Sequence, residues 1–192
     1  MMAAGTLLDV LHGYAARFPE RASALDPLRA LIADGASVTS RHEPRGHVTV
    51  GAAVLDPEGR LLVVRHRALG RWLMPGGHLE PGDRTLLDAA LRELLEETGI
   101  SPEQVRVPAL WREVPIHIDC HVIPANPRKG EPEHAHWDFR FLFEMVGTER
   151  SMVLQTEEVL DARWLAPDAH SEIVAAVIRA ALKDDPRARP AR

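Results

Sequence analysis

The chain has 192 residues, of which 45% are hydrophobic and 27% charged, and its formal net charge is -5. So apolar a composition supports a sizeable core and argues against global disorder. The acidic balance argues against general nucleic-acid binding, which usually requires a basic surface. We therefore expect one globular domain with an appendage, and no nucleic-acid partner.

Cysteine content and hydropathy predict where the protein is located. Cys120 is the single cysteine, so an internal disulfide is excluded and an oxidising compartment is not indicated. No apolar run approaches the roughly 20 residues that a membrane helix needs. Residues 1–16 lack the basic and continuously apolar regions of a signal peptide. We expect a cytoplasmic protein that has no membrane partner.

Two helices are predicted before the first strand. Residues 6–19 begin with a capping-box pattern and carry apolar residues at helical spacing. Residues 26–35 open with Asp26 as N-cap, followed by proline, and end in glycine. Residues 1–44 are therefore predicted to form a helical extension that packs against the main domain, with homodimer formation as the alternative.

From residue 46 onward, β-type patterns dominate. A helix is predicted over 85–98, a second over 168–183, and a frayed tail over 184–192. Few helices among many strands predict an α+β fold for a main domain over 45–183. The predicted strands are 47–55, 61–64, 72–74, 105–114, 117–123, 137–145 and 159–165.

The helix predicted over 85–98 carries the first candidate site. Glu93, Glu96 and Glu97 are spaced i, i+3 and i+4, so their carboxylates occupy one arc of the helix. A solvated acidic face is the ordinary interpretation of such an arc. The leucines form a separate apolar stripe, which comprises Leu87, Leu91, Leu94 and Leu95.

The loop before this helix favours a metal site. Glycine and proline at residues 75–77 and 81–82 allow tight turns that bring backbone carbonyls close to an ion. Hard cations such as Mg²⁺ prefer oxygen ligands, usually a few carboxylates together with substrate phosphates. Arg92 is predicted to pair with Asp83 and to hold the loop against the helix.

The segment from residue 76 to residue 100 resembles the box motif of the Nudix family. That motif is a glycine, five residues, a glutamate, seven residues and then Arg-Glu-apolar-x-Glu-Glu-x-Gly-apolar. The first half differs, because Asp83 replaces the glutamate and one additional residue, expected near Arg84, precedes Arg92. The second half is matched in full by Arg92, Glu93, Leu94, Glu96, Glu97, Gly99 and Ile100.

The resemblance implies a Nudix-type α/β/α sandwich with a mixed sheet. It also implies metal-dependent hydrolysis of a diphosphate linkage in a nucleoside diphosphate derivative or a related organic pyrophosphate. The partner would be a small-molecule nucleotide or another diphosphate. The metal would be Mg²⁺, with Mn²⁺ as an alternative, held by the three box glutamates and the Gly77 carbonyl. Such an ion neutralises charge in the transition state and lowers the pKa of a bound water.

Two positions are candidates for the general base. In the family this base is sometimes a box glutamate and sometimes a residue on a distant loop. Glu93, beside Arg92, is the candidate in the box, and both are assigned catalytic roles. Glu157 and Glu158 are the distal candidates, and Glu158 is the one given a catalytic role; the alternative is that both are plain turn residues.

Polar residues alternate along two of the predicted strands. Because residues two apart share a strand face, pairing of these strands would gather imidazoles and carboxylates on one side. Three interpretations are open: a hydrogen-bonded polar face, contact with the substrate, and a second metal site for Zn²⁺ or Mn²⁺. The set comprises His117, Asp119, His121, His134, His136 and Asp138, of which the last three are assigned to substrate binding.

Two further substrate contacts are predicted near the first hairpin. Arg65 is a candidate for contact with phosphate, and Trp72 for stacking on a base. A solvated hairpin arginine and a tryptophan in the core or at its rim are the ordinary alternatives.

Three other activities compete with the leading hypothesis. A house-cleaning nucleoside triphosphate pyrophosphohydrolase is the nearest. An isopentenyl diphosphate isomerase is disfavoured, because that reaction uses a cysteine early in the fold and Cys120 follows the box. A non-catalytic nucleotide-ligand sensor on the same scaffold is expected to have lost box glutamates, whereas all three are present.

Overall fold

The computed structural model describes residues 4–112, 114–128, 130–147 and 151–166. No helix in this part of the chain is long and apolar enough to cross a membrane. In chain order the elements are α1 (Ala4–Arg17), the 3-10 helix η1 (Pro19–Leu25), α2 (Asp26–Ala33), β1 (Gly46–Leu55), β2 (Leu61–His66), β3 (Arg71–Leu73), β4 (Gly76–His78), α3 (Leu86–Thr98), η2 (Pro102–Gln104), β5 (Val105–Arg106), η3 (Ala109–Trp111), β6 (His117–Ile123), β7 (His134–Met145) and β8 (Val159–Leu165).

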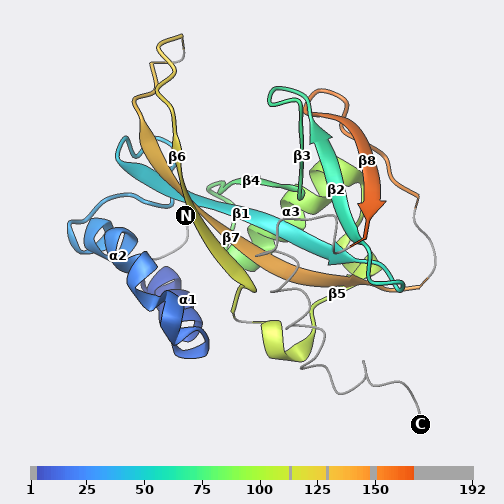
Figure 1. Cartoon of the computed structure of the whole chain (residues 1–192), viewed down its shortest axis with the longest axis horizontal. Coiled ribbons are helices and arrows are strands. Elements are labelled where there is room, and N and C mark those ends of the chain that lie inside the picture. Colours follow the sequence, from blue (N-terminus) through green and yellow to red (C-terminus); the bar gives the residue numbers. More distant parts are fainter. Residues whose placement is uncertain (1–3, 113, 129, 148–150, 167–192) are drawn as a thin grey trace.

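A mixed, curled sheet forms the centre of the molecule, with its path running β3-β2-β1-β7-β5 (Figure 1). Off this path, β4 pairs with β1, β6 with β7, and β8 with β2. β1 and β7 run parallel in unbroken register, from Gly46 beside Ala135 to Leu55 beside Glu144. The predicted α+β class is confirmed.

The two faces of β1 and β7 differ in chemistry, since successive side chains of a strand point to opposite faces. On one face Val48, Val50 and Phe139 belong to the main hydrophobic cluster, which also contains residues of α3. On the other face His47 lies beside His136 in the register. The second face is therefore polar around the two histidines, and it becomes apolar toward the end of the strands, where Ala53, Leu55 and Leu142 form a second hydrophobic cluster.

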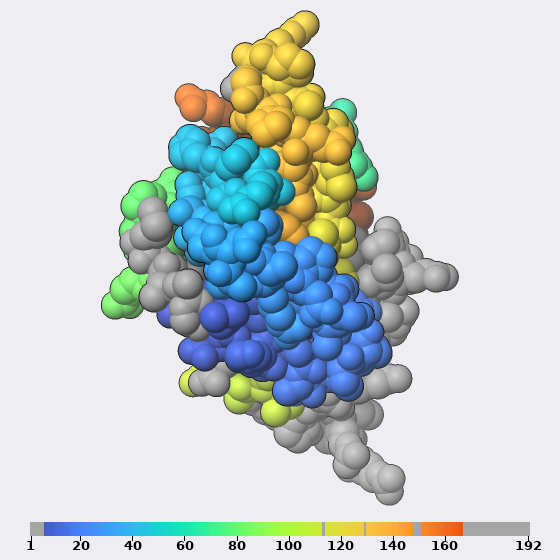
Figure 2. All heavy atoms as spheres, turned by 90° about the vertical axis from the view of Figure 1, so that its left-hand side faces the viewer, coloured from blue at the N-terminus to red at the C-terminus, as the bar shows by residue number. Residues whose placement is uncertain are grey.

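The helices α1 and α2 pack against the apolar side of this sheet. Leu7, Leu11 and Tyr14 are buried in the same cluster as the β1 valines. The Ile118 N–H donates a hydrogen bond to the Tyr14 hydroxyl (3.2 Å). Figure 2 shows the N-terminal helices, in blue, against the rest of the molecule. The predicted packing is observed, while the boundary at residue 44 and the homodimer stay predictions.

Two predicted boundaries are wrong for local steric reasons. The strand expected over 105–114 ends at Arg106, because Pro108 lacks an N–H donor and the 3-10 helix η3 follows. The N-cap of α2 is Leu25 instead of Asp26, because η1 runs directly into this helix.

Two other segments differ in kind from the expectation. The glycine loop around Gly76 forms the short strand β4, paired with β1. The strand expected from Trp137 begins earlier, at His134, because it pairs with the full length of β6 and β1. The helix predicted over 168–183 and the tail over 184–192 lie outside the described residues.

Candidate metal and catalytic site

The helix α3 positions the box glutamates, and its two ends are set by local sequence. The Thr85 side chain accepts a hydrogen bond from the Asp88 N–H (3.0 Å), which is the usual N-cap arrangement. Gly99 closes the helix with a φ of 72°, a left-handed conformation that glycine adopts without strain.

The buried face of α3 coincides only in part with the leucine stripe, of which Leu94 is fully buried. Leu95 is 43% exposed, and Leu87 and Leu91 are only partly buried. The buried residues are Leu86, Ala89, Ala90, Glu93, Leu94, Glu97 and Thr98. Two of the three box glutamates therefore face the protein interior instead of solvent.

These two glutamates are carboxylates in a desolvated setting. Glu93 is 8% exposed and Glu97 3%, whereas the Glu96 side chain is 51% exposed. Burial raises the pKa of Glu93 to about 7 and that of Glu97 to about 8, and neighbouring carboxylates add to both increases. Oxygen ligands that lie together and lack enough counter-charge fit a divalent cation.

The Arg92 side chain connects the loop of the box to its helix. Its Nε and Nη2 donate to the two carboxylate oxygens of Asp83, both at 3.1 Å. Its Nη1 donates to Glu93 (3.0 Å) and to Glu96 (2.9 Å). Its Nη2 also donates to the backbone carbonyl of His78 (2.8 Å). The predicted ion pair with Asp83 is present despite the additional residue in the box.

The strand β4 brings backbone close to the carboxylates. The Gly76 N–H donates to the Glu97 carboxylate (3.1 Å). At Gly77 a Cβ atom would lie 2.6 Å from Oε1 of Glu93, so any other residue there requires this carboxylate to shift. The glycine backbone of β4 therefore lies directly against the two buried carboxylates.

Adding a methyl group at Gly77 tests this close approach. We expect Gly77→Ala to lower activity by about 100-fold, because an ångström-scale displacement of the reacting groups costs that much. Gly82→Ala is the matched control, since a Cβ there has no neighbour within 4 Å. Steady-state kinetics on both variants, with circular dichroism as a folding check, makes the comparison. Equal activities would contradict the proposed role of Gly77.

The distal candidate Glu158 lies close enough to interact with the box. Its charge contributes to the raised pKa of both Glu93 and Glu97. Arg67 fixes its backbone: the Arg67 N–H donates to the Glu158 carbonyl (2.7 Å), and the Arg67 guanidinium donates to the Thr156 carbonyl (2.7 and 3.0 Å). The Glu158 side chain is exposed, as is that of its neighbour in sequence.

The substrate residues predicted from sequence fall into two groups. Arg65 and Trp72 are register partners on β2 and β3. The Arg163 guanidinium lies 3.9 Å from the centre of the Trp72 ring, so a cation covers one face of that ring. His134 and His136 lie on β7, and β1 separates them from the first group. Trp111 and Trp137 are buried in the core.

The strands β6 and β7 pair as expected. His121 lies opposite His136, and Asp119 opposite Asp138. Both of these carboxylates accept a hydrogen bond from the Arg140 guanidinium, Asp138 at 2.8 Å and Asp119 at 3.3 Å. The pairing therefore gathers imidazoles and carboxylates as expected, with His121 Nδ1 3.4 Å from Asp119, and the interpretation as a hydrogen-bonded polar face accounts for the two aspartates.

Further along these strands, His117 stands apart from the other imidazoles. It lies opposite Arg140 in the strand register and is 5% exposed. Burial, together with the Arg140 charge, lowers its pKa to about 4. His117 is therefore a neutral, interior group.

Two histidines that sequence reasoning missed join the polar face. The His47 ring lies 4.4 Å from that of His136, centroid to centroid. The His78 ring lies 5.1 Å from His47 and 5.3 Å from His136. The only signal in the sequence was alternation of His47 with Thr49, which carries no information until β1 is known to pair with β7.

A match to a family model over most of the chain shows the protein's family. The family model described as the NUDIX domain matches residues 45–185. The chain belongs to the Nudix family.

Curated relatives match over a shorter length. The phosphatase NudJ of Escherichia coli, in strain K12 and in O1:K1 / APEC, is 54% identical over 59 residues. This segment is 30% of the chain and 37% of the relative, so the chain matches little more than a third of the length of these proteins.

Solved structures share the fold at lower identity. A Caenorhabditis elegans Ap4A hydrolase in a binary complex has a TM-score of 0.52 and 19% identity, covering 69% of this chain and 92% of that one. A Nudix-family hydrolase from Clostridium perfringens has a TM-score of 0.51 and 20% identity, covering 70% and 95%. At 19% and 20% identity, both likenesses bear on the fold alone.

Proposed function

We propose that the protein hydrolyses a diphosphate linkage in a nucleoside diphosphate derivative or a related organic pyrophosphate, using Mg²⁺, which Mn²⁺ can replace. The buried carboxylates of Glu93 and Glu97, placed against the glycine backbone of β4, carry this proposal. Nudix membership supports the reaction class, and the phosphatase name of the E. coli relatives supports release of a phosphate group. We propose that it acts in the cytoplasm on a small molecule.

The proposed metal ligands are Glu93, Glu96, Glu97 and the Gly77 carbonyl. When bound, a divalent ion supplies positive charge to the phosphate oxygens and lowers the pKa of a water ligand. Arg92 orients the carboxylates of Glu93 and Glu96, and the Gly76 N–H orients that of Glu97. This arrangement preorganises the ligands before substrate arrives.

Glu158 is proposed to accept the proton of the attacking water. One oxygen of Glu93 already accepts a hydrogen bond from Arg92, which weakens it as a base, whereas the Glu158 side chain is exposed beside the box. The backbone contacts from Arg67 keep the segment that carries Glu158 in place. A positioned general base contributes roughly 10²–10⁴-fold to a rate.

Replacing this carboxylate tests the assignment. We expect Glu158→Gln to lower kcat by about 100-fold, at the lower end of the effect of a general base. Mg²⁺ affinity is expected to stay within a few-fold. Glu157→Gln is the matched control, because Glu157 is an equally exposed neighbour. If the two variants lose activity equally, Glu158 is not the base.

A substrate panel tests the proposed function itself. Metal-stripped protein is assayed with Mg²⁺ or Mn²⁺ against nucleoside triphosphates, nucleoside diphosphate sugars, dinucleoside polyphosphates and non-nucleotide organic pyrophosphates. Product analysis separates release of phosphate, pyrophosphate and nucleoside monophosphate. We expect metal-dependent turnover of at least one class. Tight binding of a nucleotide without turnover of any class would contradict hydrolysis and indicate a ligand sensor.

A further inference from the structure

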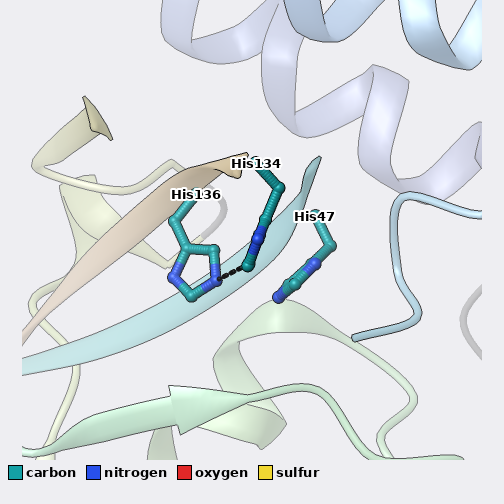
Figure 3. Close-up of side chains that lie close together, drawn as sticks. All are labelled: His47, His134 and His136. Carbon is teal, nitrogen blue, oxygen red and sulfur yellow. Dashed lines mark hydrogen bonds between the residues drawn. The ribbon is translucent and has the colours of Figure 1, made fainter. Parts of the chain in front are cut away.

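Three imidazoles meet on the polar face of the central strands, apart from the carboxylates of α3. His47 comes from β1, and His134 and His136 come from β7 (Figure 3). One ring nitrogen from each of the three lies within 4.8 Å of the others. The parallel register of β1 and β7 places His47 directly beside His136. The cluster is therefore fixed by the sheet.

The spacing of two of these rings suits a metal ion. The Nε2 atoms of His134 and His136 are 3.1 Å apart. With Zn–N bonds of about 2.0–2.1 Å, two ligands of a tetrahedral ion lie about 3.3 Å apart. This pair therefore already has almost the separation of chelating ligands. The ligand atom of His47 lies within 4.8 Å of the other two, so it needs to approach by at most about 1.5 Å to complete that geometry.

A backbone contact presents one nitrogen of the cluster as a ligand. His134 Nδ1 lies 2.8 Å from the Pro132 carbonyl oxygen. A carbonyl only accepts, so Nδ1 carries the hydrogen and Nε2 keeps its lone pair for His136 or for an ion. A ligand histidine is usually held in this way, with its second nitrogen donating to a backbone carbonyl.

The environment of His47 is the strongest indication that the cluster binds a ligand. It is 3% exposed, and neither ring nitrogen has a hydrogen bond of acceptable geometry within the described part of the chain. A buried polar group without such a bond is destabilising by about 1–3 kcal/mol. A metal ion that accepts a lone pair from the His47 ring would satisfy this buried group.

We propose that His47, His134 and His136 form a binding site for a transition-metal ion of the Zn²⁺ class, separate from the carboxylate site. Imidazole ligands favour Zn²⁺ over Mg²⁺, which prefers oxygen. Three protein ligands leave one coordination position open for water or for an oxygen atom of a small molecule. The nearby aspartates do not fill it, because Arg140 binds both Asp119 and Asp138.

His78 connects this site to the box. Its ring lies within 5.3 Å of the rings of His47 and His136, centroid to centroid, and its carbonyl accepts a hydrogen bond from Arg92. Because Gly77 pairs with Val50 and His78 with Thr49, the histidine site and the Glu93 contact lie on opposite faces of these strands. The site does not depend on the proposed hydrolysis, because none of its ligands is a box residue.

Direct metal binding tests the proposal without reference to activity. Tag-free, metal-stripped protein is titrated with Zn²⁺ and with Co²⁺ as a spectroscopic probe, in excess Mg²⁺ so that the carboxylate site is occupied. We expect stoichiometric binding and the intense visible absorption of four-coordinate Co²⁺. His134→Gln and His136→Gln are expected to weaken binding at least tenfold. His12→Gln, an exposed histidine on α1, and Cys120→Ser, an exposed thiol, are expected to leave binding unchanged.

The alternatives give different results. Zn²⁺ binding that survives in both the His134 and His136 variants overturns the proposal, as does binding that disappears in Cys120→Ser. Binding that excess Mg²⁺ abolishes would assign the ion to the box. If neither variant binds Zn²⁺ less tightly but both raise KM for a substrate, the cluster contacts substrate instead. Both histidines are only half-buried, so thermal melting identifies any variant that fails to fold.

Discussion

Glu97→Gln is expected to lower kcat/KM by about 10³-fold or more. A metal that neutralises phosphate charge supplies several kcal/mol of transition-state stabilisation, and about 4 kcal/mol corresponds to that factor. Glutamine keeps the shape of the side chain and can still accept a hydrogen bond from the Gly76 N–H. The loss therefore reports the missing charge. Calorimetric titration with Mg²⁺ is expected to show weakened binding, and activity within a few-fold of the parent would exclude Glu97 as a metal ligand.

The same substitution is expected to stabilise the metal-free protein at high pH. Glu97 has a folded-state pKa of about 8 against an ordinary 4.5, because it is buried. The folded state thus binds more protons than the unfolded state between these values, so the free energy of unfolding falls as pH rises through this range. The Glu97→Gln variant has no carboxylate to ionise at this position, so its stability does not fall in this way. Above pH 8 it is expected to be more stable than the parent by about 1–3 kcal/mol, and below pH 4.5 the substitution is expected to bring no such gain.

Urea denaturation in a chelator, at both ends of this pH range, measures the difference. Glu96→Gln is the matched control, because the Glu96 side chain is 51% exposed and its charge is already solvated. It is expected to lose activity without a pH-dependent gain in stability. If the Glu97 variant is less stable than the parent at high pH, the prediction fails. That result would mean that the protein stabilises the ionised Glu97 carboxylate without a metal ion.

Arg92→Lys is expected to lower the free energy of unfolding by about 1–3 kcal/mol, the usual cost of leaving buried hydrogen-bonding groups unsatisfied. Asp83 is 6% exposed and Glu93 8%, so both carboxylates would lose hydrogen bonds in a desolvated setting. Lysine keeps the charge but lacks the planar fork that contacts two carboxylate oxygens at once. Mg²⁺ affinity is expected to fall as well, because the loop and the helix are no longer joined.

A double-mutant cycle with Asp83→Asn isolates the pair. Contacting charges show coupling energies of about 0.5–3 kcal/mol, and we expect a value in the upper half of that range for two hydrogen bonds of 3.1 Å. Arg84→Ala is the control, because its side chain is 89% exposed. Additive effects of Arg92 and Asp83 would mean that the altered spacing of the box has uncoupled the loop from the helix.

The box could be predicted from sequence because its contacts are local. The additional residue was expected at the junction near Arg84, and the structure has Arg84 exposed and Thr85 as the N-cap. The ion pair between Asp83 and Arg92 survives because the extra residue enlarges the turn and leaves the helix unchanged. Asp83 and Arg92 are only nine positions apart, so their spacing in the sequence is enough to predict that the loop and the helix bring them together.

Burial and long-range pairing could not be predicted in this way. Periodicity identified an acidic arc and an apolar stripe on α3, but it did not show that Glu97 is buried and Leu95 exposed. His47 reaches the histidine cluster only because β1 pairs with β7, some 89 positions later in the chain. No local pattern contains that information.

The parallel pairing of β1 with β7 also constrains how the protein is made. β1 is the central strand, and its partner β7 ends only at Met145. During synthesis, β1 leaves the ribosome long before this neighbour exists, with its even-numbered valines exposed. The helices α1 and α2 precede it in the chain and pack against that same apolar cluster. We therefore expect the N-terminal helices to shield the nascent strand, so that deleting them reduces the yield of soluble protein more than it affects the finished active site.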